Sequence, residues 1–138
     1  MVPHTNISVN KQTAEHYFVT NLHRLDIWRE FTAFENIVKK VGIPVTRLWL
    51  DGSFISQRQY PADVDVVAYV EYDFRAKNYG YLTNISGRFT KLHVIWIGLW
   101  QTPDSMQQAI NELEIFNWLT WFNTDANDLP KGFIELNW

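Results

Sequence analysis

The sequence predicts an α/β (α+β) domain in which helices flank a small mixed β-sheet, and three observations support this class. Segments with the periodicity of amphipathic helices alternate with short apolar runs of strand length. Hydrophobic residues make up 46% of the chain and charged residues 20%, a balance that is typical of a globular domain. The 138 residues contain neither a repeat nor a linker, so we expect a single domain over residues 1–138.

The first forty residues are expected to be helical after a loosely held arm over residues 1–12. Thr13 suits a helix N-cap. Apolar residues follow on one face of that helix: Tyr17, Phe18, Leu22 and Leu25. The helix either breaks or continues at Asp26. A second amphipathic run is spaced by three or four residues: Ile27, Phe31, Phe34, Val38 and Val41. Gly42 followed by Pro44 predicts its end.

Four strands and two further helices are expected downstream. The strands are the apolar segments 45–50, 64–70, part of 89–100, and 133–136. The last of these is short and is expected at an edge of the sheet. A weak helical pattern covers residues 74–86, and a stronger helix follows the third strand. Either Asp104 opens this helix in a capping box with Gln107, or Thr102 caps it with Pro103 in its first turn.

Charge and composition exclude several functional classes. The formal net charge is −3, so no basic excess is present to neutralise the phosphates of a nucleic acid. The chain has no Cys, which rules out disulfides and thiolate zinc sites. The first residues lack the charged and apolar regions of a secretory signal, and the longest apolar run, residues 94–100, is too short to cross a bilayer. We therefore expect a cytoplasmic protein with no membrane partner.

Aromatic residues are abundant, with seven Trp, six Tyr and nine Phe. So many large rings are hard to bury in one small domain, and Trp and Tyr concentrate at interfaces. We expect some rings in the core and others on a surface that binds a protein partner or a second copy of the chain.

The most informative segment joins two apolar strands through Gly52 and Ser53 and then through Asp63 and Asp65. Glycine permits a tight turn in which backbone N–H groups approach a phosphate closely, and the Ser hydroxyl adds a donor. Two Asp separated by one residue on a strand project to the same face, so they can hold magnesium together with substrate phosphates. Arg58, between the two motifs, is either a phosphate contact or an ordinary exposed loop residue.

The order and spacing of these residues resemble the signature of the DNA polymerase β-like nucleotidyltransferases. The clear motif covers residues 48–70, and a looser resemblance extends over most of the chain from about residue 25. Segments 61–67 and 130–134 are also similar to an uncharacterised bacterial family of that superfamily. The resemblance implies a palm-like core that binds Mg²⁺ or Mn²⁺ and a nucleoside triphosphate, with ATP as the first choice. Gly52 and Ser53 would contact the nucleotide, and Asp63 and Asp65 would be the catalytic metal ligands.

One part of that signature is missing. The superfamily usually carries a third carboxylate on a later strand, and the matching strand here, residues 90–97, contains no Asp or Glu. His93 lies near the expected position and is a candidate replacement as ligand or base, with a packed structural His as the alternative. Magnesium, however, prefers oxygen ligands. Glu71 and Glu135 are further candidates that have no positional support. Loss of one ligand should weaken transfer more than nucleotide binding.

Three hypotheses of function remain open. The first is a nucleotidyltransferase that moves a nucleotidyl group from a triphosphate to a hydroxyl of a protein, an RNA or a small molecule. By resemblance, one version of it is the antitoxin of a toxin–antitoxin pair or a phage-defence component. The second is a catalytically degenerate module that keeps the nucleotidyltransferase fold and acts through a protein partner. The third is a structural α/β protein without a nucleotide site.

Overall fold

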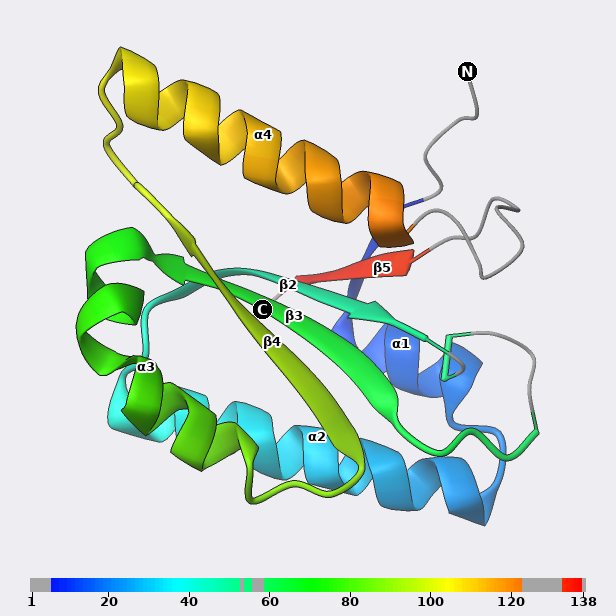
Figure 1. The fold of residues 1–138 in the computed structure, drawn as a ribbon. Helices are drawn as coiled ribbons and strands as arrows, with labels where there is room; N and C mark the ends of the chain where they lie inside the picture. Colours follow the sequence, from blue (N-terminus) through cyan, green and yellow to red (C-terminus); the bar gives the residue numbers. More distant parts are fainter. Residues whose placement is uncertain (1–5, 53, 56–58, 123–132, 138) are drawn as a thin grey trace.

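The computed structural model describes residues 6–52, 54–55, 59–122 and 133–137, and it confirms the mixed α/β class (Figure 1). The elements in chain order are β1 (Asn6–Asn10), α1 (Lys11–Phe18), α2 (Leu22–Val41), β2 (Val45–Asp51), β3 (Val64–Glu71), α3 (Tyr72–Ser86), β4 (Leu92–Leu99), α4 (Ser105–Phe122) and β5 (Phe133–Asn137). The strands and helices predicted after residue 44 are all found, with bounds shifted by a few residues.

The strands form one sheet in the order β1-β5-β2-β3-β4. Its outer pairs, β1 with β5 and β3 with β4, are parallel, and the two inner pairs are antiparallel. The sheet is therefore mixed, as predicted. α3 is the crossover that returns the chain from β3 to its parallel neighbour β4.

Two predictions about the ends of the described chain are wrong. The expected loose arm over residues 1–12 is ordered from Asn6 onward, because residues 6–10 form β1 and Lys11 begins α1. β5 lies between β1 and β2 and is not an edge strand. Both errors have one cause: β1 is short and polar, and the partner that stabilises it lies more than a hundred residues away in the sequence.

Asparagine side chains, and not Thr13, begin the first two helices. Asn10 accepts a hydrogen bond from the backbone N–H of Thr13 (2.8 Å), and Asn21 caps α2 in the same way. Such caps satisfy N–H groups that a helix start leaves without partners. The predicted first helix is therefore interrupted before Asn21, and Asp26 lies inside α2. The predicted end of α2 is confirmed at Gly42, which has a left-handed φ of 76°.

Helices cover both faces of the sheet (Figure 1). α1, α2 and α3 pack on one face, and α4 lies over the other. The larger core, on the first face, includes the buried rings Trp28, Phe31, Phe34, Phe54 and Trp96. The smaller core, beneath α4, consists of Trp49, Val67, Tyr69, Ile97, Leu99 and Phe133. Other rings are exposed, among them Tyr17, Tyr60 and Phe116, so the rings divide between core and surface as expected.

A reciprocal capping box begins α4. Asp104 accepts from the backbone N–H of Gln107 (2.8 Å), and Gln107 accepts from the backbone N–H of Asp104 (3.1 Å). The prediction of this box is confirmed, and the alternative start at Thr102 is wrong. Neither α4 nor any other described helix has both the length and the hydropathy needed to span a membrane.

Tyr69 on β3 gives a prediction about stability. Its side chain is fully buried, and its hydroxyl has no hydrogen-bond partner among the described residues. Burial raises the pKa of Tyr69 above its ordinary value of 10.0. The unfolded chain therefore releases this proton at a lower pH than the native protein does. The stability that the neutral ring contributes is complete below pH 10.0 and is lost as the pH rises further.

Tyr69→Phe is expected to be as stable as the wild type at neutral pH, or more stable by up to about 1 kcal/mol, because a buried hydroxyl without a partner is removed. Above pH 10.0 the variant should lose less stability than the wild type. Urea unfolding at a series of pH values measures both effects. Parallel stability curves for the two proteins in the alkaline range would contradict the prediction.

Candidate functional site

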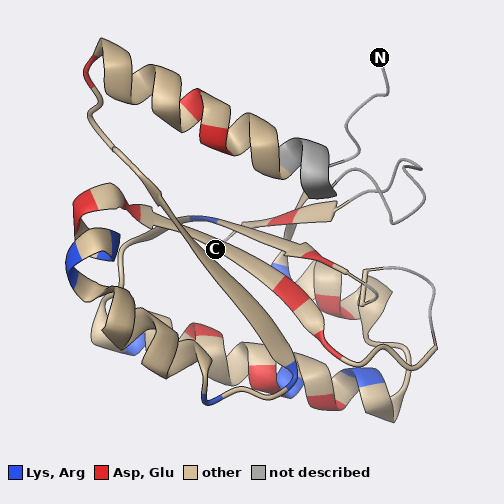
Figure 2. Ribbon diagram, viewed as in Figure 1, with Lys and Arg blue, Asp and Glu red and all other residues tan. Residues whose placement is uncertain are grey.

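The predicted site lies where the end of β2 meets the beginnings of β3 and β4. Figure 2 shows acidic residues at the end of β2 and at the beginning of β3, on either side of the connection between these strands. In the sheet register, Asp51 is opposite Asp65, and Asp65 is opposite His93. Paired residues project to the same face of a sheet, so these side chains form one row across three strands. The row lies on the α4 face, because Asp65 alternates along β3 with residues of the larger core.

Gly52 directly adjoins the Asp65 carboxylate. Its φ is 86°, a left-handed conformation that favours glycine. A Cβ atom placed on Gly52 would lie 2.8 Å from Asp65 Oδ2 and 3.2 Å from Asp65 Cγ. Because Gly52 has no side chain, the Asp65 carboxylate can occupy this space. Gly52 also begins a turn that closes when the backbone N–H of Ile55 donates to the Gly52 carbonyl (3.1 Å).

The buried side chain of Arg24 holds this turn in place. Arg24 on α2 is 4% exposed, and it donates to the carbonyl oxygens of Phe18 (2.9 Å) and Phe54 (2.5 Å). Its guanidinium also lies over the Phe54 ring, at 5.1 Å from the centroid. Phe54 is fully buried and stacks on Trp28, with ring centroids 6.0 Å apart. The turn after Gly52 is thus fixed to the start of α2 by an apolar ring and by a buried cation.

The later part of the connection is also bound to the start of α2. The side-chain amide of Asn21 donates to the Gln59 carbonyl (2.8 Å), and the His23 ring bonds the Pro61 carbonyl (2.5 Å). His23 therefore has a structural contact, consistent with its lack of metal-ligand spacing in the sequence. Together with the bond from Arg24 to the Phe54 carbonyl, these bonds fix both the early and the late part of the connection between Gly52 and Asp63.

The structure describes some of the predicted site residues and not others. Gly52, Asp65 and His93 lie together, and Asp63 is half-buried immediately before β3. Ser53 and Arg58 lie outside the described residues, so their phosphate contacts stay predictions. Among the residues that the structure describes, no group of three or more His, Cys, Asp or Glu side chains could hold a metal ion.

His93 is in contact with Asp65, as its position in the sequence suggested. His93 Nδ1 donates to Asp65 Oδ1 at 3.2 Å, and the His93 side chain is 62% exposed. A packed structural role for His93 is therefore wrong. An ionised carboxylate only accepts hydrogen bonds, so in a neutral ring this contact places the proton on Nδ1 and leaves the Nε2 lone pair toward solvent. Such a ring can accept a proton at Nε2 while Asp65 orients it.

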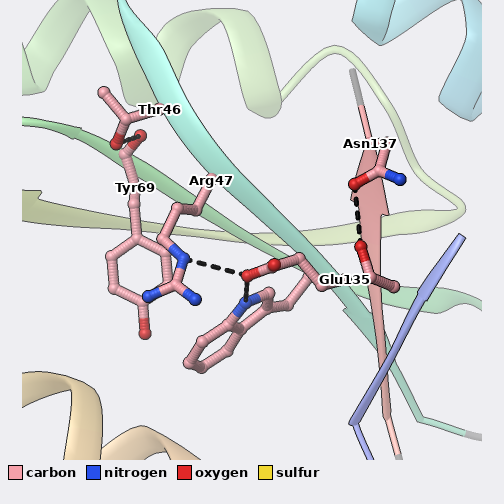
Figure 3. Close-up of polar contacts among 7 residues, drawn as sticks. Thr46, Arg47, Tyr69, Glu135 and Asn137 are labelled. Atoms are coloured by element: carbon pink, nitrogen blue, oxygen red, sulfur yellow. Dashed lines mark hydrogen bonds and ion pairs between the residues drawn. The ribbon is translucent and has the colours of Figure 1, made fainter. Parts of the chain in front are cut away.

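The other proposed substitutes for the third acid have structural roles. Glu135 Oε1 accepts from Arg47 Nε (2.9 Å) and from the indole N–H of Trp49 (2.8 Å), as Figure 3 shows for Arg47 and Glu135. Glu71 caps α3 by accepting from the backbone N–H of Phe74 (2.8 Å). Neither carboxylate belongs to the row that contains Asp65.

Asp51 is the residue of this row that the sequence analysis missed. It is 1% exposed and is paired with Asp65 in the register. We sought the third acid on a later strand, whereas Asp51 lies on the preceding one. Its position before Gly52 at the end of an apolar strand was visible in the sequence, but its place beside Asp65 follows only from the antiparallel register of β2 and β3.

Asp63 and Asp65 are the side chains that the sequence motif selects as metal ligands. Asp63 and Asp65 offer carboxylate oxygens, which Mg²⁺ and Mn²⁺ prefer. The space beside Gly52, which a Cβ would fill, leaves the Asp65 carboxylate directly against the backbone.

Comparison with known proteins identifies a family. No curated protein and no solved structure matches the chain. A family model described as "Family of unknown function (DUF6932)" matches residues 1–137. The match spans nearly the whole chain and includes every predicted site residue, so the protein belongs to this family.

Proposed function

We propose that this protein is a nucleotidyltransferase of the DNA polymerase β-like type. It binds a nucleoside triphosphate, ATP in the first instance, together with Mg²⁺ or Mn²⁺. It transfers the nucleotidyl group to a hydroxyl of a protein, an RNA or a small molecule. Asp63 and Asp65 hold the metal, and Gly52, Ser53 and Arg58 contact the phosphates.

The contact between Gly52 and Asp65 carries this proposal. The two residues belong to separate parts of the sequence motif, and a Cβ on Gly52 would be 2.8 Å from the Asp65 carboxylate. A glycine that the chain needs only for a turn would not have to adjoin an acidic side chain. A glycine beside a metal-binding carboxylate allows a phosphate and its counterion to share the same backbone turn.

The chemistry can be assigned to side chains of this chain. Transfer forms a bond between the acceptor oxygen and the α-phosphorus, breaks the bond from that phosphorus to pyrophosphate, and releases the hydroxyl proton. A bound divalent cation supplies charge neutralisation on the phosphate oxygens. The Asp65 carboxylate orients His93, and His93 Nε2 receives the proton. The bonds from α2 to the connection keep its backbone in place for the phosphates.

A non-catalytic binding module is the second candidate, and one observation favours it. The described residues contain no metal-capable group of three or more side chains, and His93 takes the place of a carboxylate on β4. In this version the site binds a triphosphate without turnover, and the protein acts on a partner. A role in a toxin–antitoxin pair or in phage defence fits either candidate.

Calorimetric titration of ATP, and then of the other triphosphates, with and without Mg²⁺, tests the nucleotide site. We expect metal-dependent binding to the wild type, and binding weaker by at least about tenfold in the double variant Asp63→Asn/Asp65→Asn. Asp26→Asn/Asp73→Asn, which removes two exposed carboxylates elsewhere, is the matched control and should bind as the wild type does.

The outcomes separate the candidate functions. Folded wild-type protein that binds none of the triphosphates, or equal loss in both double variants, would rule out the nucleotide site and favour a structural α/β protein. Binding without pyrophosphate release in the presence of protein, RNA and small-molecule hydroxyls would favour the binding module. Binding with release would support transfer.

A further inference from the structure

Helix α4 has large apolar residues on its solvent side and polar residues among those on its inner side, the reverse of an ordinary surface helix. Its outer side carries large apolar residues with high exposed fractions: Met106 (74%), Ile110 (45%), Leu113 (59%) and Phe116 (58%). Polar residues lie among those turned inward: Gln107 is half-buried and Asn111 is 8% exposed. A surface helix normally turns its apolar residues to the core.

Specific bonds hold α4 in this orientation. The Asn111 side chain donates from Nδ2 to the Trp100 carbonyl (2.8 Å) and accepts at Oδ1 from the Trp100 backbone N–H (3.1 Å). Ile115 and Trp118 pack against the core beneath the helix. Rotating α4 to bury its outer side would break both Asn111 bonds and expose Trp118. These contacts therefore keep the apolar side of α4 exposed to solvent.

The outer residues have the spacing of a helix-packing seam. Alternating steps of three and four residues separate Met106, Ala109, Leu113 and Phe116. This is the repeat by which one helix packs along another. The seam extends from Met106 to Phe116, or about 15 Å of helix. We call these four residues, together with Ile110, the α4 seam.

The charge around the α4 seam selects the kind of partner. No Lys or Arg occurs between Lys91 and Lys131. Asp104, immediately before α4, and Glu112, on α4, are both exposed. A second copy of α4 would bring acidic side chains to an acidic border and would offer no opposite charge. A helix bordered by Lys or Arg would complement both the seam and its border.

We propose that the α4 seam is a docking site for a partner protein that presents an amphipathic helix with an apolar stripe and basic borders. α4 covers the face of the sheet that carries Asp65 and His93, and the α4 seam is on the side of the helix that is turned away from the sheet. The inference does not depend on the proposed function, because helix docking requires no nucleotide.

A designed peptide is the probe: a fluorescein-labelled 21-residue amphipathic helix with Leu along one stripe and Lys on both borders, of about six helical turns. Anisotropy titration with the full chain is expected to show saturable binding. Leu113→Gln/Phe116→Gln should weaken it by at least about tenfold, whereas Gln12→Ala, at an exposed position of α1 on the other face of the sheet, should leave it unchanged. Thermal unfolding of each variant verifies folding.

Charge reversal provides the second arm of the test. Glu112→Lys should bind the Lys-bordered peptide less tightly than the wild type does, and should bind a Glu-bordered version of the same peptide more tightly. Equal binding of both peptides by wild type and Glu112→Lys would overturn the assignment of a basic partner. So would a wild-type dimer in sedimentation equilibrium that Leu113→Gln/Phe116→Gln makes monomeric, because the occupant would then be a second copy.

Discussion

Gly52→Ala is expected to abolish metal-dependent triphosphate binding in a protein that still folds. Alanine at a φ of 86° is strained, and its Cβ would lie 2.8 Å from Asp65 Oδ2. The carboxylate must then turn away from the backbone, which removes the contact that carries the proposed function. Calorimetry of ATP with Mg²⁺ measures the loss, and we expect at least about tenfold weaker binding.

Gly42→Ala is the matched control for backbone strain. Gly42 has a similar φ of 76°, but a Cβ on it would meet nothing within 4 Å. This variant should lose about 1–2 kcal/mol of stability from the left-handed conformation alone and should bind triphosphate normally. If both variants bound as the wild type does, the proximity of Gly52 to Asp65 would have no functional meaning.

Arg24→Ala is expected to have the largest effect on stability among the variants considered. It leaves the carbonyl oxygens of Phe18 and Phe54 without their buried donor and removes the cation over the Phe54 ring. The loss of a charged donor to one buried and one part-buried acceptor should cost about 3 kcal/mol. The turn after Gly52 loses its support at the same time, so triphosphate binding should also weaken.

Two further variants separate geometry from charge at this position. Arg24→Lys keeps the charge but lacks the planar guanidinium, whose Nη1 donates to both carbonyl oxygens and which lies over the Phe54 ring. Its stability should therefore lie between those of Arg24→Ala and the wild type. Arg29→Ala removes an exposed arginine of the same helix and should change stability by less than about 0.5 kcal/mol. Urea unfolding measures all three variants. Equal stability of Arg24→Ala and Arg29→Ala would mean that the buried bonds contribute nothing.

The sequence predicted those parts of the fold that depend on local signals. β2 and β3 are rich in large and β-branched apolar residues, which indicate their positions in the sequence. The capping box at Asp104 and the glycine end of α2 are also local, and both are confirmed. β1 was missed because its five residues, Asn-Ile-Ser-Val-Asn, carry no strong strand signal of their own. Its stability comes from pairing with β5.

The candidate site likewise combines residues that the sequence predicts with residues whose place depends on the sheet register. The spacing in the sequence selects Gly52, Asp63 and Asp65, and the structure places Gly52 beside Asp65. The contact of His93 with Asp65 depends on the parallel register of β3 and β4, and the place of Asp51 depends on the antiparallel register of β2 and β3. Arg24 gave no signal in the sequence, because its buried role depends on where α2 crosses beneath the turn.

The position of β5 in the sheet has a consequence for synthesis on the ribosome. β5 joins β1 to β2, and the side-chain bond from Ser8 to Asn137 connects residues 129 positions apart. At ordinary elongation rates, roughly 6 to 26 s separate the appearance of these two residues. During that interval β1 has no strand partner, and one edge of β2 is open to other chains. Of the elements described, β5 emerges after all others, and its insertion between two waiting strands completes the sheet.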